Sequence, residues 1–600
     1  MTLRWAICEV FEQFLDGGAQ ECSNLRRNLR RNLGRLVEAS EGGHTRGHWG
    51  TIMVEVLTAA QMRALEGAAI EQGLLTGVAL MERAGAGVVA AIHAHFAVPD
   101  RERGASPSRS PRYLETKEGA RAAFVLCGPG NNGGDGYVIA RLLQAAGWRV
   151  EVQSFGDVAA LPPDARVNYD RWCALGAVTP YVDAEFSLNP EDFGRDSVIV
   201  DAGFGIGLSR PVVGLDAFAR CCRSAVRAKA GWRREEAVAQ SLVVAVDVPS
   251  GLDADSGYAV MGPGEGQVRE QLHADLTVTF HAPKLGQYLG HGPEICGALE
   301  VVDIGLAGAR HEGAVQRVEA KARRLRKSGG HKFAHGHVFV LGGGPGKGGA
   351  ARLSARGALR VGAGLVTLGV ERAALAENAA RLDAVMLSAV KDGGAFEQIL
   401  GDGRIGVVVL GPGLGHDRAR DLVPVALEAG RRCVLDADAL SAYEVAPNHL
   451  FDRLNGGTVL TPHMGEFRRL FPDIASKLTD RPTQAPAFSK VDAVRAAAAR
   501  AQAVVLLKGA DTVIAHPDGH AALHAACYAR EMPWLATAGA GDVLAGIIAG
   551  LMARGFSAFD AAQQGAWLHV EAARAVGPGM IAEDLPEALR EVFRTLETPA

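Results

Sequence analysis

Short hydrophobic runs alternate with longer stretches of helical period along most of the chain. In the first half these runs lie at 123–126, 148–152, 198–200, 242–246, 276–280 and 299–302. In the second half they lie at 338–341, 365–368, 407–410, 433–435, 458–460, 504–507 and 512–515. Apolar strands separated by helices are typical of parallel sheets covered by helices. The pattern therefore predicts two successive α/β domains with no obvious repeat between them.

Polar segments divide the chain. Residues 1–52 contain an arginine-rich and a Gly/His-rich stretch without an apolar period. We predict for them a disordered extension or a mis-assigned start, with a basic targeting arm as the alternative. The polar stretch 307–317 predicts a linker between one domain at 53–306 and another at 318–600.

Two further segments, 100–119 and 221–236, are predicted as polar surface insertions because they mix charges, prolines or arginines. Near the start of the first domain, Thr58 is a plausible N-cap. The helix that follows would carry the apolar residues Met62, Leu65 and Ile70.

The composition of the chain indicates which kinds of molecule it binds. The chain has 600 residues, with 63 Lys+Arg against 67 Asp+Glu and a net charge of -4, so it offers no footprint for nucleic acid or an acidic membrane surface. The nine cysteines are scattered apart from Cys221 and Cys222, which argues against a zinc site or a disulfide framework and favours the cytoplasm. The sequence has no 18-residue apolar span. We expect small-molecule substrates.

Two glycine-rich loops that contain an aspartate lie far apart in the chain, at 127–136 and 537–542. Each follows an apolar run and opens a helical pattern. Glycines at such a turn let backbone N–H groups approach a phosphate, whereas an aspartate suits proton or metal chemistry. The loops predict two active sites for nucleotide-like ligands.

Polar residues follow three strands of the first domain, and the carboxyl ends of parallel strands meet at one edge of a sheet. Their oxygens could hold a hard cation while one carboxylate acts as a base. Structural turns and helix caps remain the alternative, as does a dinucleotide fingerprint at Gly128, Gly130 and Gly133 with Glu151 following. The residues are Asn131, Asn132 and Asp135, then Asp201, Gly203, Gly205 and Gly207, then Asp247 and Ser250.

In the second half, the loop 342–348 lacks the first glycine and the Ser/Thr of a phosphate-binding Walker A motif. Residues 538–541 are better placed, because their N–H groups open an apolar helix. The helix dipole would stabilise Asp542 as an anion. A structural cap is the alternative role for this aspartate.

The segments 80–85, 128–136, 247–253 and 277–284 together resemble the NAD(P)H-hydrate epimerase family. The resemblance implies K+ ligation by Asn132, Asp201 and Ser250, and contact of Asp247 with the reacting ring. Asp216 departs from a tyrosine that the family often has. The implied substrate-binding residues are Asn131, Asn132, Gly133, Gly134, Asp135, Gly205, Ile206, Gly207, Leu208, Ser209, Arg210, Pro211 and Asp247.

The segments 411–415, 461–467, 508–512 and 540–542 resemble the ribokinase-like superfamily, and within it the ADP/ATP-dependent NAD(P)H-hydrate dehydratases. Ala540 stands where the family more often has threonine. The implied hydrate-site residues are Ala350, Gly413, His463 and Asp542. The implied ADP-binding residues are Lys508, Gly509, Ala510, Asp511, Thr512 and Gly541.

Together the resemblances imply a Rossmann-like domain followed by a ribokinase-like domain, and a bifunctional repair enzyme. It would epimerise R and S hydrates of NADH and NADPH (NADHX and NADPHX), with Asp247 as proton shuttle and K+ bound. It would then dehydrate the S form with ADP or ATP and Mg²⁺, with Asp542 as the base. We also expect a homo-oligomer. A sugar or vitamin-precursor kinase, a dehydrogenase and a non-catalytic binding module remain alternatives.

Overall fold

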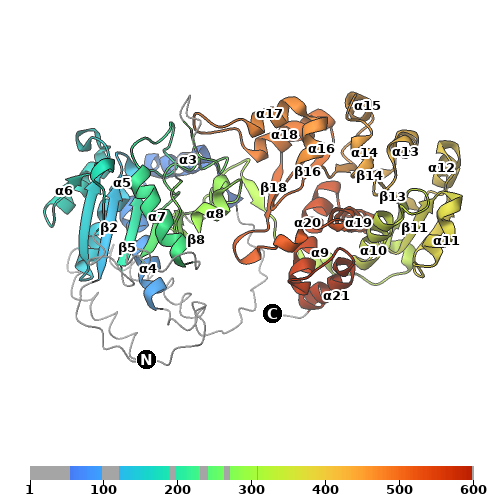
Figure 1. Cartoon of the computed structure of the whole chain (residues 1–600), viewed down its shortest axis with the longest axis horizontal. Coiled ribbons are helices and arrows are strands. Elements are labelled where there is room, and N and C mark those ends of the chain that lie inside the picture. The colour runs from blue at the N-terminus through green and yellow to red at the C-terminus, as the bar shows by residue number, and fades with distance from the viewer. Residues whose placement is uncertain are drawn as a thin grey trace. The chain divides into compact units, whose positions relative to one another are not determined.

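The computed structural model describes residues 55–97, 121–188, 197–229, 241–261, 271–306 and 308–597. Residues Ile52–Leu596 group into one compact unit, which contains two sheets (Figure 1). The predictions for 1–52 and for 100–119 lie outside the described residues.

The first sheet has seven parallel strands in the order β4-β3-β2-β5-β6-β7-β8. All six strands predicted in this half are confirmed, and the seventh was missed because it is only two residues long. The strands are β2 (Ala122–Cys127), β3 (Arg149–Ser154), β4 (Thr179–Pro180), β5 (Ser197–Ala202), β6 (Leu242–Val246), β7 (Leu276–Phe280) and β8 (Ala298–Val302).

Helices cover both faces of this sheet. Along β2, Ala123 and Val125 pack with one group of helices, whereas Phe124 and Leu126 pack on the opposite face with α7 (Asp216–Lys229). Side chains alternate along a strand, so a fully apolar strand supplies two hydrophobic cores. The first group comprises α3 (Ala59–Glu71), α4 (Gly77–Ala97), α5 (Asn131–Ala145) and α6 (Pro163–Cys173).

Two details differ from the expectations. The prediction of a surface insertion at 221–236 is wrong for residues 221–229, which belong to α7. Cys222 and Ala225 of this helix are buried at helical spacing, although arginines lie nearby in the sequence. In α3, Thr58 caps the helix and Met62 is buried as expected. Ile70, however, is 43% exposed.

The second sheet has eleven strands in the order β1-β9-β18-β17-β16-β15-β14-β13-β10-β11-β12. The seven neighbouring strands at one end of this sheet, β16-β15-β14-β13-β10-β11-β12, pair in parallel. Strand β17 is antiparallel to both of its neighbours. The seven predicted strands are confirmed, and β1, β9, β12 and β18 were not predicted. Neither β12 nor β18 has β-branched residues. The strands are β1 (Glu55–Val56), β9 (Val315–Arg317), β10 (His337–Leu341), β11 (Leu365–Val370), β12 (Met386–Ala389), β13 (Ile405–Leu410), β14 (Arg432–Leu435), β15 (Thr458–Leu460), β16 (Val504–Leu507), β17 (Asp511–Ala515) and β18 (Ala521–Ala525).

The predicted domain boundary falls inside this sheet. Strand β9 occupies the last three residues of the predicted linker 307–317 and pairs in parallel with β18. Strand β1, from the start of the first predicted domain, is antiparallel to β9. Backbone pairing therefore ties residues 55–56 to the second sheet.

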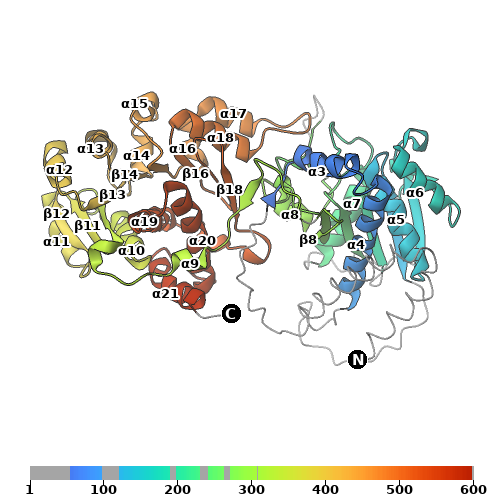
Figure 2. The same ribbon diagram turned by 180° about the vertical axis from the view of Figure 1, so that it is seen from behind.

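Helices also cover both faces of the second sheet (Figure 2). One layer, which packs with Phe339 and Leu341, contains α12 (Gly393–Leu400), α13 (His416–Glu428), α14 (Asp438–Ser441), α15 (Asn448–Phe451), α16 (Met464–Leu470), α17 (Pro472–Thr479) and α18 (Lys490–Ala501). The other, which packs with Val338 and Val340, contains α9 (Ala322–Leu325), α10 (Gly349–Arg360), α19 (Ala540–Ala553), α20 (Ala558–Val576) and α21 (Asp584–Glu597). The short helices α8 (Gly292–Cys296) and α11 (Leu375–Ala379) complete the described set.

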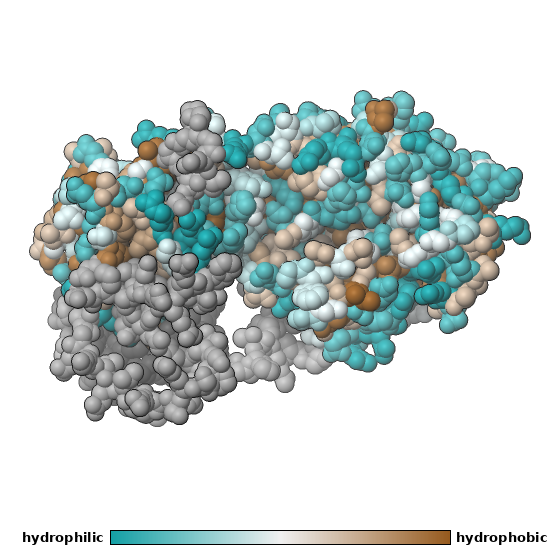
Figure 3. All heavy atoms as spheres, viewed as in Figure 1, coloured by the Kyte–Doolittle hydropathy of each residue, from teal (hydrophilic) through white to brown (hydrophobic). Residues whose placement is uncertain are grey.

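On the face drawn in Figure 3, hydrophilic residues predominate among those described, and hydrophobic residues are scattered between them. None of the described helices is long and apolar enough to cross a bilayer.

Candidate active sites

The glycines of the first loop allow close contact between backbones. A Cβ atom at Gly128 would lie 1.7 Å from the carbonyl oxygen of Gly203, and one at Gly133 would lie 2.0 Å from that of Gly128. Helix α5 then starts after Gly130, which supplies no side-chain cap. The loop after β2 is thus packed against the loop after β5, and the first N–H groups of α5 have no side-chain acceptor from that cap.

Asp201 lies at the end of β5 and is fully buried. Its carboxylate accepts hydrogen bonds from the Gly203 N–H at 3.1 Å, the Ser250 N–H at 2.8 Å and the Ser250 hydroxyl at 2.6 Å. Burial raises the pKa of Asp201 to about 6, although these donors act in the opposite direction. The structure brings Asp201 and Ser250 together as the sequence predicted.

Asn132 and Asp247 lie on either side of Gly205. A Cβ atom at Gly205 would lie 3.1 Å from Asn132 Oδ1 and 3.1 Å from Asp247 Oδ2, so a larger residue would displace both. Asn132 Nδ2 is buried and has no hydrogen-bond partner among the described residues. The loop 203–205 thus links Asp201 and Ser250 at one end to Asn132 and Asp247 at the other.

Asp247 follows β6 with a left-handed backbone, at φ 65°. Its Oδ1 accepts hydrogen bonds from Lys284 Nζ at 2.7 Å and from the Thr279 hydroxyl at 2.9 Å. Its Oδ2 accepts one from the Ile206 N–H at 3.3 Å. The left-handed turn directs this carboxylate toward the strand end of β7 and the loop after β5.

Asp135, on the first turns of α5, is the other buried carboxyl predicted for this site. Burial raises its pKa well above the usual range, and repulsion from Asp247 and Glu66 adds to this shift. The carboxyl groups of Asp135 and Asp247 are therefore close enough to act on each other.

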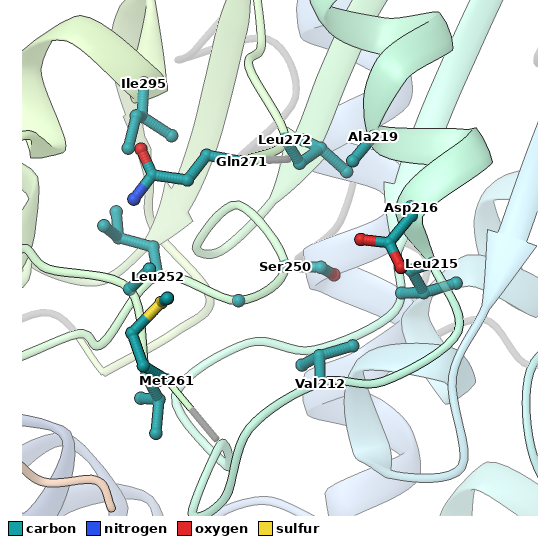
Figure 4. A pocket seen from close by; sticks show the side chains of 13 residues that line it. Val212, Leu215, Asp216, Ala219, Ser250, Leu252, Met261, Gln271, Leu272 and Ile295 are labelled. Carbon is teal, nitrogen blue, oxygen red and sulfur yellow. The ribbon is translucent and has the colours of Figure 1, made fainter. Parts of the chain in front are cut away.

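The predicted substrate loop borders a pocket. Residues 205–209 line it together with Ala59, Arg63, Asp253, Ala254, Ala485 and Pro486. Arg210 and Pro211, also predicted to bind substrate, are not among its lining residues. A second pocket is lined by Ser250 and by Asp216 of α7, with Met261 and Gln271 on the side opposite Asp216 (Figure 4). Asp216 thus faces a different hollow from the substrate loop.

In the second sheet, Asp542 lies in the first turn of α19, after Gly539 with a left-handed φ of 89°. Next to it, Lys508 Nζ donates to Asp436 Oδ1 at 2.7 Å, and the Thr461 hydroxyl donates to the same oxygen at 2.9 Å. A Cβ atom at Gly541 would lie 3.4 Å from Lys508 Nζ. The structure therefore brings Lys508, Gly541 and Asp542 together, as predicted.

The charges around Asp542 are mostly negative. Burial raises the pKa of Asp542 to about 7, and repulsion from Asp436 adds to this, while Lys508 opposes it. Burial disfavours the Lys508 ammonium, but Asp436 and Glu466 outweigh that effect and raise the pKa of Lys508. Asp542 is thus poised to exchange a proton near neutral pH.

His463 is the N-cap of α16, and its ring Nδ1 accepts from the N–H groups of Gly465 at 2.9 Å and Glu466 at 3.4 Å. Because Nδ1 accepts, the neutral ring carries its proton on Nε2, which lies 3.5 Å from Glu466 Oε1. The side chain of His463 is 55% exposed. One ring nitrogen therefore caps the helix, and the other lies near Glu466 on an exposed side chain.

Ala350 and Gly413, two predicted hydrate-site residues, are neighbours, since a Cβ atom at Gly413 would lie 3.6 Å from that of Ala350. In the predicted nucleotide loop, Asp511 pairs with Lys490 at 2.6 Å and the Thr512 hydroxyl donates to the Gly509 carbonyl at 2.7 Å. The side chains of Asp511 and Thr512 therefore shape the loop 508–512.

Comparisons with known proteins cover most of the chain. It is 35% identical to the bifunctional NAD(P)H-hydrate repair enzyme of Moorella thermoacetica over 90% of this chain and 97% of that one. The chain belongs to this family. Residues 338–592 match the family described as NAD(P)H-hydrate dehydratase, and residues 77–286 match the YjeF-related protein N-terminus.

Two further repair-enzyme relatives cover single halves. An NAD(P)H-hydrate epimerase of Roseobacter litoralis is 41% identical over 42% of this chain and 100% of its own length. The structure of an ADP/ATP-dependent NAD(P)H-hydrate dehydratase from Bacillus subtilis, co-crystallised with ATP/Mg²⁺, is 26% identical over 45% of this chain and 94% of its own, with a TM-score of 0.37.

The sequence predictions did not single out three charged residues that contact the candidate sites: Lys284, Asp436 and Glu466. Each is buried or paired with a predicted site residue. Two of them could have been found from the sequence. Lys284 ends the segment 277–284, and Asp436 directly follows the apolar run 433–435.

Proposed function

We propose that the first half of the chain epimerises the R and S hydrates of NADH and NADPH, and that the second half dehydrates the S hydrate at the expense of ADP or ATP. The observation that carries this proposal is the placement of an aspartate beside a lysine and a glycine loop in each half: Asp247 after β6, and Asp542 in the first turn of α19. The family membership supports both halves.

In the epimerase half, we propose that residues 131–135, residues 205–211 and Asp247 hold the hydrated dinucleotide. The first N–H groups of α5 suit a phosphate. Asp247 would take or give the proton at the C6 hydroxyl of the nicotinamide ring, and Lys284 with Thr279 would hold its carboxylate in position.

The oxygen atoms around the loop 203–205 fit K+. Asn132, Asp201 and Ser250 offer an amide, a carboxylate and a hydroxyl oxygen, as hard cations require. The buried Asp201 has no cationic partner among the described residues, and a bound cation would favour its charged form. When bound, K+ would supply positive charge that orders these loops.

In the dehydratase half, we propose that Lys508, the loop 508–512 and Gly541 bind the adenine nucleotide. Ala350, Gly413, His463 and Asp542 would hold the hydrate. Asp542 takes the proton of the C6 hydroxyl, and the hydroxyl oxygen receives a phosphoryl group from the nucleotide. Phosphate then leaves C6 as the N1 lone pair forms a C6=N1 bond, and loss of a C5 proton to water gives the C5=C6 bond. The N–H groups at the start of α19 would stabilise the transferring charge.

In the dehydratase half, Mg²⁺ would bind together with the nucleotide phosphates. Among the described residues there is no group of three or more His, Cys, Asp and Glu side chains that could hold a metal. Mg²⁺ is commonly held by one or two carboxylates together with substrate phosphates. We propose the same arrangement here, with the metal neutralising phosphate charge.

Cytoplasmic location and a homo-oligomeric state stay predictions.

The decisive experiment supplies the full-length protein with mixed R and S hydrates, with and without ADP. We expect complete recovery of NADH with ADP, and only interconversion of R and S without it. Recovery of the S half alone would contradict the epimerase assignment. A stable phosphorylated product without NADH would instead indicate a kinase.

A further inference from the structure

One face of α3 borders the pocket formed by the substrate loop. Ala59 and Arg63 line this pocket, and Glu66 follows at the spacing that places all three on the same side of a helix. Arg63 donates from its guanidinium to the Ile206 carbonyl at 2.9 Å, which joins this face of α3 to the loop. Glu66 thus lies on the same side of α3 as these two pocket-lining residues.

Glu66 lies within electrostatic reach of the proposed reacting centre. The charged groups that act on it are Asp247, the buried Lys284, and Arg63 on its own helix. Asp135 of α5 in turn responds to Glu66 and to Asp247. Ile206 also joins the two elements, because Asp247 accepts from its N–H and Arg63 of α3 donates to its carbonyl.

The two neighbouring carboxyl groups are held differently. Asp247 accepts from Lys284, Thr279 and the Ile206 N–H, whereas no described residue makes a hydrogen bond or ion pair with the side chain of Glu66. Burial raises the pKa of Glu66 to about 7, with Asp247 adding to the shift and Lys284 and Arg63 opposing it. Asp247 is thus held by three donors, whereas Glu66 is held by none of the described residues and has a pKa near neutral pH.

We propose that Glu66 is the second proton-transfer group of the epimerase site and acts opposite Asp247. This inference rests on the proposed epimerase function. It assigns a role to a residue that no sequence motif singled out, and it supplies the acid that an exchange at C6 requires in addition to a base.

The step balances with these two groups and water. The Glu66 carboxyl gives its proton to the C6 hydroxyl as the C6–O bond breaks, water leaves, and the N1 lone pair forms a C6=N1 bond. A second water attacks C6 from the opposite face, the C=N electrons return to N1, and the proton of that water goes to Asp247. The reverse direction uses Asp247 as the acid and Glu66 as the base.

In either direction the pair works with one proton shared between its members. We therefore expect kcat for epimerisation to fall as the pH rises through about 7, where Glu66 loses its proton. The isosteric variant Glu66→Gln keeps the volume of the side chain but transfers no proton.

The test compares Glu66→Gln with wild type in the full chain, following conversion of R to S hydrate from pH 5.5 to 9. We expect kcat to fall about 10²-fold or more, KM to change less than about threefold, and the decline above neutral pH to disappear. Glu71→Gln, at the exposed end of the same helix, is the matched control and should behave as wild type. Dehydration of S hydrate with ADP checks that each variant is folded.

A Glu66→Gln enzyme with a wild-type kcat and the same decline above neutral pH would overturn the inference. A change in KM alone would overturn it too, since it would reduce Glu66 to a positioning residue. If Glu66→Gln does not fold, Glu66→Asp is measured instead. A fall of kcat at a pH different from that of wild type supports the inference, and a fall at the same pH contradicts it. Absence of epimerisation in wild type would contradict the proposed function itself.

Discussion

Lys284 Nζ lies 2.7 Å from Asp247 Oδ1, with the lysine side chain 0% and the aspartate side chain 8% exposed. Removing either charge from water costs free energy, and in this pair each charge offsets the cost of the other. If one partner were lost, the remaining charge would be buried without compensation. Lys284 also donates to Thr279 and to the Phe280 carbonyl, so the ammonium has three acceptors. The pair holds the carboxylate that we propose to exchange protons at C6.

Asp247→Asn should abolish epimerisation and also destabilise the fold. The amide cannot exchange the proton, and it leaves the Lys284 charge unpaired, which costs about 3–5 kcal/mol of the free energy of unfolding. Adding Lys284→Met should restore most of the stability without restoring the rate. Urea unfolding and R-to-S conversion measure the two effects separately. A double variant that regains epimerisation would show that Asp247 only pairs with the lysine.

Asp542→Asn should abolish dehydration and leave epimerisation intact. The amide preserves the volume of the side chain but accepts no proton, so we expect a loss of about 10²- to 10⁴-fold. Asp417→Asn, at the exposed first turn of α13, is a control for loss of a carboxylate at a helix start. NADH recovery from S hydrate with ADP gives the rate. Retention of more than about a tenth of it would reduce Asp542 to a structural role.

The dehydratase should lose activity in mild acid. Because the pKa of Asp542 is raised to about 7, the carboxyl is largely protonated below that pH and cannot act as a base. We expect kcat/KM for S hydrate to rise with pH through about 7 and then level off. Lys508→Met removes the cation that opposes this shift and should move the rise to higher pH. A flat wild-type profile between pH 6 and 8 would be inconsistent with this assignment.

Substitutions of His463 should distinguish the capping role of Nδ1 from a ligand contact by Nε2. An asparagine side chain would keep an acceptor for the N–H groups of Gly465 and Glu466, so His463→Asn should change the stability little. His463→Ala should cost about 1 kcal/mol, because the cap is lost. Both should raise KM for S hydrate if Nε2 contacts the ligand. An unchanged KM in the asparagine variant would limit His463 to its capping role.

The epimerase should depend on a small monovalent cation. Asn132, Asp201 and Ser250 offer oxygen atoms, which ligate a hard cation such as K+, whereas an alkylated ammonium presents only methyl groups to them. Epimerisation measured after exchange of K+ for tetramethylammonium should fall, while dehydration serves as the comparison. An unchanged rate, together with a fully active Asp201→Ala, would refute the assignment of the cation site.

The repeating pattern of strands was predictable because a strand buried on both faces must be apolar at every position, as the residues of β2 are. Short or alanine-rich strands such as β4 and β18 carry no such pattern and were missed. Helix α7 was hidden by its arginines, because its buried face is made of small residues such as Cys222 and Ala225.

The sequence alone determined the two strand series and the motifs with Asp201, Asp247 and Asp542, because these depend on local order along the chain. Only the tertiary structure decided which charges meet. Lys284 reaches Asp247 across 37 residues, Lys508 reaches Asp436 across 72, and Glu66 comes within electrostatic reach of Asp247 from a distant helix. Such pairings follow from strand order and loop packing, and the resulting burial sets the pKa of each carboxyl, which no local pattern records.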